Sequence, residues 1–133
     1  MSARFSLDIS RFVTNTHLKL KDAVTGVTYG IAEQVIKTTP VRTGKARGNW
    51  ILTMNAMSKA QTGVLDKTGE HSLDRVAQAL EAYELGKTRD IFFTNTLPYI
   101  VMLEFGWSPQ APAGMVRLSL LKFRGTEVHS LGV

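Results

Sequence analysis

Residues 8–40 read D-I-S-R-F-V-T-N-T-H-L-K-L-K-D-A-V-T-G-V-T-Y-G-I-A-E-Q-V-I-K-T-T-P, and this stretch decides the fold. Its apolar residues recur at steps of three and four or their sums, which places them on one stripe of an amphipathic helix. They are Ile9, Phe12, Val13, Leu20, Val24, Val27, Ile31 and Val35. Leu18 and Ile36 lie on the opposite side, so a second contact surface is expected there. Pro40 disfavours helical backbone at Thr39, so the helix is predicted to stop before it.

The predicted helix is long for its chain. Residues 9–38 span roughly 45 Å at 1.5 Å per residue. A compact chain of 133 residues has a radius of gyration of only about 14 Å. The helix is therefore expected either to project beyond its own domain or to break at Gly26 or Gly30. These glycines are spaced four apart, and they permit either a bend or the close approach of another backbone.

The remaining chain is predicted to alternate between short elements. Strands are expected at residues 5–9, 50–54 and 90–95. Helices are expected at residues 72–86, with Ser72 as the cap and Gly86 at the end, and at residues 97–105. Residues 115–124 fit a strand or a helix, and we favour the helix. Loops are expected at residues 38–48, 58–71 and 106–114. These elements predict an α+β fold in a single domain over residues 1–133, with a long N-terminal helix and shorter helices packed on a small, mainly antiparallel sheet.

Residues that carry chemistry are sparse. The sequence has no cysteine, which excludes disulfides and thiolate chemistry. The three histidines are His17, His71 and His129. None of them has a neighbour at metal-ligand spacing. Gly44 and Lys45 resemble part of a phosphate loop, but Ala46 stands where that loop needs serine or threonine. We therefore predict no enzyme activity, no catalytic residue, no metal and no cofactor.

Membrane insertion is not expected either. No apolar run approaches the roughly 20 residues that span a bilayer, and the N-terminus lacks the apolar core of a signal peptide. Hydrophobic residues make up 44% of the sequence and charged residues 20%, a balance that permits a packed core. A soluble globular protein is the expectation.

The positive charge is concentrated near the start of the chain. Residues 1–50 contain eight basic and three acidic side chains, whereas residues 51–133 contain eight of each. The segment from residue 34 to residue 65 has no acid, and its basic residues are Lys37, Arg42, Lys45, Arg47 and Lys59. Such a segment attracts phosphate or an acidic protein surface, although a solvated basic loop is an equally ordinary explanation.

Two stretches carry a resemblance to a known family. They are T-P-V-R-T-G-K-A-R-G-N-W at residues 39–50 and N-T-L-P-Y-I-V-M-L-E-F-G-W-S-P-Q-A-P-A-G-M-V-R-L-S-L at residues 95–120. Together, and with the order of the predicted elements, they resemble the tail-completion and tail-to-head joining neck proteins of long-tailed bacteriophages, of the lambdoid minor tail protein Z type. The chain differs from that pattern at Arg42, where relatives often carry an acid, and in its short polar end after Arg124.

The resemblance implies a structural virion protein that is assembled in the bacterial host cytoplasm. It would complete the tail and join it to the neck as part of a homo-hexameric ring through which DNA passes. Its partners would be copies of itself, neighbouring neck and tail proteins, and genomic DNA in the channel. The candidate contacts to DNA or to an adjoining ring are Arg42, Lys45 and Arg47.

A ring subunit must bury apolar surface against its neighbours, and aromatic residues and methionine are favoured there. The candidate interface residues are Phe105, Trp107, Met115 and Glu104. Glu104 is expected to pair with Arg42 or Arg47 of an adjacent subunit. The alternative is that the apolar residues belong to the internal core, and we assign Tyr99 and Met102 to that core because they are spaced three apart on a helix.

An alternative function is that of a small basic protein that binds DNA without sequence specificity. The basic first half and a calculated pI near 9.7 motivate it. The sequence contains no zinc finger, no aromatic RNA-binding pair and no clear helix-turn-helix.

Overall fold

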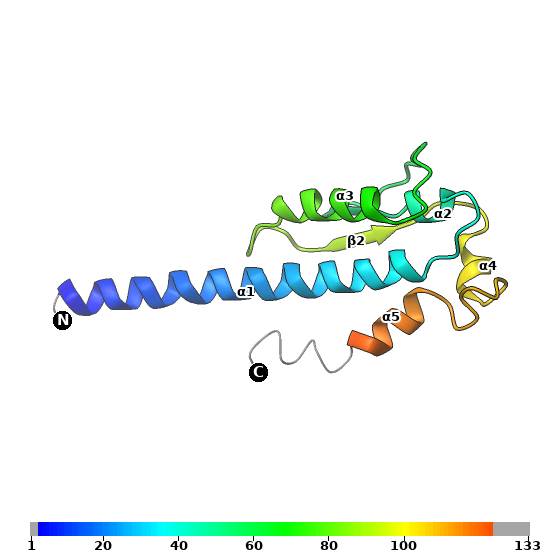
Figure 1. Cartoon of the computed structure of the whole chain (residues 1–133). Coiled ribbons are helices and arrows are strands. Elements are labelled where there is room, and N and C mark those ends of the chain that lie inside the picture. The colour runs from blue at the N-terminus through cyan, green and yellow to red at the C-terminus, as the bar shows by residue number, and fades with distance from the viewer. Residues whose placement is uncertain (1–2, 124–133) are drawn as a thin grey trace.

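The computed structural model describes residues 3–123, with side chains described for residues 19–121. Five helices and two strands follow one another along the described chain (Figure 1). In order they are α1 (Ala3–Thr38), α2 (Lys45–Gly48), β1 (Ile51–Met54), α3 (Glu70–Glu81), β2 (Ile91–Thr94), α4 (Ile100–Glu104) and α5 (Val116–Phe123). The predicted α+β class is confirmed. The polar end after Arg124 and His129 lie outside the described residues.

α1 is one uninterrupted helix of 36 residues, which is about 54 Å long. It ends at Thr38, as Pro40 predicts. The predicted strand at residues 5–9 is wrong, because these residues already belong to the helix. The helix does not break at its glycines, and a Cβ at Gly26 would have no other atom within 4 Å. α1 therefore projects beyond the domain, and no other described element lies beside its N-terminal part (Figure 1).

The last turns of α1 form the centre of the fold. Ala32, Val35 and Ile36 are each at most 1% exposed. α3 packs on one side of this segment and α5 on the other (Figure 1). Because two elements enclose this part of the helix, Val35 of the predicted stripe and Ile36 on the opposite side are both buried.

β1 and β2 form a two-stranded antiparallel sheet. Leu52 pairs with Phe93, and Met54 pairs with Ile91. The side chains of these four residues share one face, which packs into the core with α1 and α3. The ring of Trp50 stacks on that of Phe93 with centroids 4.8 Å apart. Both strands agree with the sequence prediction to within one residue at each end.

α3 begins earlier and ends earlier than its sequence indicates. Ser72 lies inside the helix and is fully buried, so the prediction that it caps the helix is wrong. Gly69 occupies the cap position with a φ of 88°. Gly86 also has a positive φ, but the helix has ended by Glu81, five residues earlier.

The C-terminal helices are short. α4 occupies only part of the predicted 97–105 helix, and Gly106 ends it in a left-handed conformation with φ 85°. α5 confirms the helical choice for residues 115–124. Tyr99 and Met102 are 36% and 44% exposed, so the prediction that they belong to the core is wrong.

Candidate functional site

The two stretches that carry the family resemblance meet in space. The side chain of Gln110 accepts a hydrogen bond from the Val41 N–H at 2.9 Å and donates one to the Val41 carbonyl at 3.1 Å. The Asn95 amide donates to the Ala46 carbonyl at 2.9 Å. Backbone of the first stretch is thus fixed to side chains of the second at two places.

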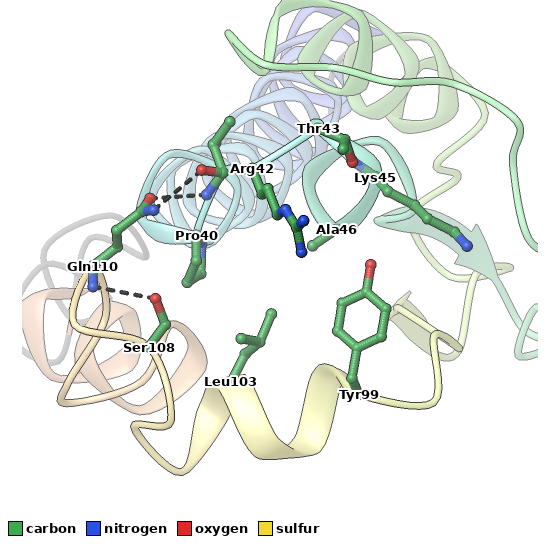
Figure 2. Close-up of a pocket in the computed structure, with 10 residues that line it drawn as sticks. Pro40, Arg42, Thr43, Lys45, Ala46, Tyr99, Leu103, Ser108 and Gln110 are labelled. Carbon is green, nitrogen blue, oxygen red and sulfur yellow. Dashed lines mark hydrogen bonds between the residues drawn. The ribbon is translucent and has the colours of Figure 1, made fainter.

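A cavity of about 490 Å³ lies between these stretches, and we call it the basic groove. Its lining residues are Pro40, Val41, Arg42, Thr43, Lys45, Ala46, Tyr99, Leu103, Ser108 and Gln110. The guanidinium of Arg42 and the hydroxyl of Tyr99 point into it from opposite sides (Figure 2), and its apolar lining residues are Pro40, Val41, Ala46 and Leu103. Among the described residues, none that lines the groove is acidic. Its chemistry therefore suits an anionic group, such as a carboxylate or a phosphate, carried on an apolar support.

Arg42 and Lys45 are exposed, and among the described residues their charged groups form no hydrogen bond or ion pair. Both charged groups are therefore available to a partner, and their predicted contact with DNA or an adjoining ring stays a prediction. Arg47 differs. Its guanidinium donates to the carbonyls of Thr39 at 2.9 Å, Lys37 at 2.7 Å and Lys67 at 2.7 Å. The carbonyls of Lys37 and Thr39 lie at the C-terminal end of α1, where a cation is favoured, so Arg47 stabilises the helix end instead of facing a channel.

Thr39 and Trp50 complete this internal structure. The Thr39 hydroxyl accepts from the Trp50 indole N–H at 2.9 Å and donates to the Val35 carbonyl at 2.6 Å. Both side chains are buried. Residues 39–44, which read T-P-V-R-T-G, therefore mainly serve to end α1 and to lead the chain toward β1. α2 directly follows these residues, so the prediction of a loop that continues through residue 48 is wrong for residues 45–48.

Asp66 caps α3 from the loop before it. Its carboxylate accepts hydrogen bonds from the N–H of Gly69 at 2.9 Å and from that of Ser72 at 2.8 Å. Burial by itself raises the pKa of Asp66, but the hydrogen bonds from Ser72 and Gly69 outweigh it and hold the pKa below its ordinary value. The charged carboxylate is thus part of the folded structure.

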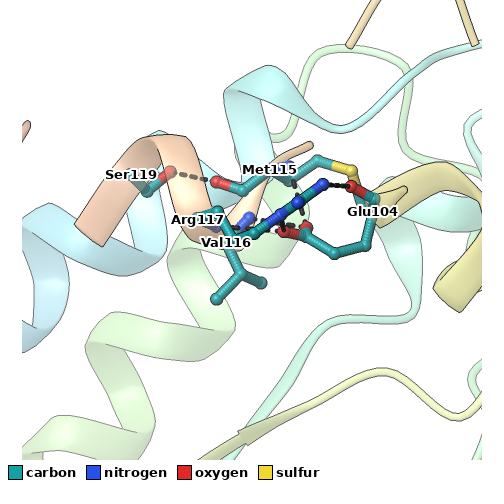
Figure 3. A network of polar contacts seen from close by, with 5 residues as sticks. All are labelled: Glu104, Met115, Val116, Arg117 and Ser119. Carbon is teal, nitrogen blue, oxygen red and sulfur yellow. Dashed lines mark hydrogen bonds and ion pairs between the residues drawn. The ribbon is translucent and has the colours of Figure 1, made fainter. Parts of the chain in front are cut away.

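Glu104 caps α5 in the same manner (Figure 3). Its carboxylate accepts from the N–H groups of Met115, Val116 and Arg117 at 2.9, 2.8 and 3.0 Å, and from Arg117 Nε at 3.1 Å. Burial raises the pKa of Glu104, but the backbone hydrogen bonds outweigh this effect and lower it. With these donors in place, Glu104 is engaged within its own chain, which corrects its expected pairing with Arg42 or Arg47 of a neighbour.

The apolar candidates for a subunit interface divide into two groups. Met115 is completely buried and cannot reach another subunit. Phe105 and Trp107 are 64% and 74% exposed. With Val101 and Met102, which are 60% and 44% exposed, they form what we call the α4 patch. The Arg117 guanidinium lies over the Phe105 ring at 5.1 Å from its centroid and supports one edge of the patch.

The sequence did not identify Gln110, Tyr99 or Leu103 as residues of a site. Gln110 bonds to a backbone 69 positions away, and no local pattern signals such a contact. Tyr99 and Leu103 are four apart, on one side of a short helix. That spacing was available in the sequence, but it does not distinguish a groove from a core.

Groups of histidine, aspartate or glutamate that could hold a metal ion are absent from the described part of the chain. Among the helices described, none combines the length and the apolarity needed to cross a membrane. The chain matches no family model, no curated protein and no solved structure.

Proposed function

We propose that the chain is a structural subunit of a bacteriophage neck that joins tail to head by assembling with copies of itself into a ring. The observation that carries this proposal is the α4 patch. Single exposed apolar residues are ordinary, but four large ones on one short helix and the loop after it are typical of an interaction surface. The resemblance of residues 39–50 and 95–120 to neck proteins supplies the biological setting.

The energetics favour association through this patch. Full burial of one such side chain contributes about 1.5–3 kcal/mol relative to exposure. Aromatic residues and methionine are the types enriched at interface cores. Glu104 fixes the end of α4 to the start of α5, so the patch is held in place before any partner arrives. Association then loses little conformational entropy at this surface.

The proposal predicts that the double variant F105S/W107S folds normally but fails to associate. Loss of two aromatic anchors is expected to weaken self-association at least about thirtyfold. Sedimentation velocity compares its oligomer distribution with that of the unmodified chain. In assembling virions, the same variant is expected to leave heads and tails unjoined.

M57S/L65S is the matched control for this prediction. Met57 and Leu65 are 60% and 62% exposed and lie outside the α4 patch. Their replacement removes similar apolar area and is expected to leave association unchanged. Equal association of F105S/W107S and the unmodified chain, together with normally joined particles, would contradict the proposal.

Non-specific DNA binding is a second candidate, supported by the exposed and uncommitted charges of Arg42 and Lys45. Each phosphate contact makes log affinity fall with log salt by about 0.9. In a salt titration against duplex DNA, R42Q/K45Q is therefore expected to lower that slope by roughly 2. Undetectable binding of the unmodified chain at low salt would remove this candidate.

A further inference from the structure

α3 presents an acidic face to solvent. At about 100° per residue, Glu70, Asp74 and Glu81 fall within an arc of about 40° on the side opposite the buried Val76. All three side chains are exposed, and none forms an ion pair within the described chain. The basic residue on this helix, Arg75, turns inward and donates to the Gly48 carbonyl at 2.7 Å, so it does not neutralise the face.

The basic groove has the opposite character. It has two free cations, Arg42 and Lys45, and no acid among its lining residues. Tyr99 adds a hydroxyl that is directed into the groove (Figure 2). The described chain thus has two separate surfaces of opposite charge, and the charged residues of neither surface form an ion pair within it.

We propose that these two surfaces bind each other between copies, so that the α3 acidic face of one subunit docks on the basic groove of the next. This inference rests on the proposed function and names the surfaces that make the contact. Charge complementarity sets which surfaces meet, while apolar burial supplies most of the affinity. The α4 patch is suitably placed for that burial, since Leu103 of the groove and Met102 of the patch are neighbours on α4.

A contact between two different surfaces of the same chain has a consequence for assembly. It is heterologous, and every added copy leaves one acidic face and one basic groove unused. In such a head-to-tail series, all surfaces are satisfied when the series of subunits closes into a ring. The charge arrangement is therefore compatible with a closed ring, and also with a two-fold dimer in which each α3 face reaches the partner's groove.

Two charge-reversed variants test the contact. R42E/K45E makes the groove acidic, and D74K/E81K makes the α3 face basic. In each variant alone the two surfaces carry like charges, and self-association at low ionic strength is expected to weaken about a hundredfold or more. An equimolar mixture of the two is expected to restore assembly, because a reversed groove fits a reversed α3 face and the two unmodified surfaces still fit each other.

The number of copies in the restored oligomers is a stricter test than the loss of assembly. Since only unlike variants fit, the restored oligomers must alternate and contain an even number of copies, which native mass spectrometry measures. K59E/R89E is the control for net charge, because it changes the formal charge as R42E/K45E does at exposed positions outside the groove. This control is expected to assemble normally.

The possible outcomes separate this inference from the proposed function. Normal assembly of either reversed variant alone, or no recovery on mixing, overturns the α3–groove contact while the ring function stands. Failure of the unmodified chain to associate at any concentration overturns both. If circular dichroism shows that a reversed variant is unfolded, the neutral variants R42Q/K45Q and D74N/E81Q replace it, and each is expected to weaken assembly by about tenfold.

Discussion

Gly48→Ala is expected to destabilise the fold severely. An alanine Cβ at this position would overlap the carbonyl oxygen of Val64 and lie 2.9 Å from the carbonyl carbon. Both are backbone atoms, so no side-chain rotation relieves the overlap. Displacing the backbone at Val64 would also disturb Asp66, two residues further along the chain, whose carboxylate caps α3. Overpacking commonly costs about 1–3 kcal/mol and occasionally more, and here we expect at least 3 kcal/mol of a total stability that is typically about 5–15 kcal/mol.

Urea denaturation followed by circular dichroism measures this loss, with Gly26→Ala as the matched control. Gly26 is inside α1 and has open space around it. Replacing glycine by alanine within a helix should stabilise it by about 0.8–1 kcal/mol. Replacing glycine by alanine is thus expected to lower the free energy of unfolding at position 48 and to raise it at position 26. A Gly48→Ala protein as stable as the unmodified chain would contradict the described approach of the two backbones.

Asp66→Asn is expected to destabilise the fold by about 2–4 kcal/mol at neutral pH. The amide keeps one acceptor oxygen, but its NH₂ group faces the N–H that the second carboxylate oxygen had accepted. A buried donor left without an acceptor costs about 1–3 kcal/mol, and the attraction between the carboxylate and the positive end of α3 is also lost. Asp90→Asn, at an exposed position before β2, is the control and should change stability by less than 1 kcal/mol.

The effect of Asp66→Asn should depend on pH. The folded-state pKa of Asp66 lies below its unfolded value of about 3.9, so its contribution is fully present above about pH 5. It is lost as the pH falls through the folded-state pKa, because the protonated carboxyl loses the same charge that the variant lacks. The difference in unfolding free energy between the two proteins should therefore shrink in acid. A difference that is constant from pH 7 to pH 2.5 would be inconsistent with this role.

Local patterns predict the helix ending before Pro40, both strands and α5. They fail at residues 5–9, where apolar residues at every second position suggest a strand. Five residues of alternation do not distinguish a strand from the start of a helix, and here the helix extends through them. Ser72 has the residue type of a cap, but Asp66, six residues away, supplies the acceptor. The choice between them depends on the path of the loop, which no local pattern encodes.

The sequence indicated the region of the candidate site, but it did not identify each of the residues that are exposed there. Both distinctive stretches meet at the groove, and Arg42, Lys45, Phe105 and Trp107 are exposed, which is compatible with the contacts predicted for them. Arg47, Glu104 and Met115 instead hold the structure together. Their residue types suit an interface equally well. Only the tertiary arrangement shows that the donors of Arg47 and the carboxylate of Glu104 already have partners in the same chain.

The central claim is that this chain works by assembling with copies of itself. Native mass spectrometry of the purified, unmodified chain at low ionic strength tests that claim most directly. We predict a closed oligomer with one fixed number of copies, six according to the family resemblance, and no ladder of longer species. A single species of 14.7 kDa at every concentration would contradict the account.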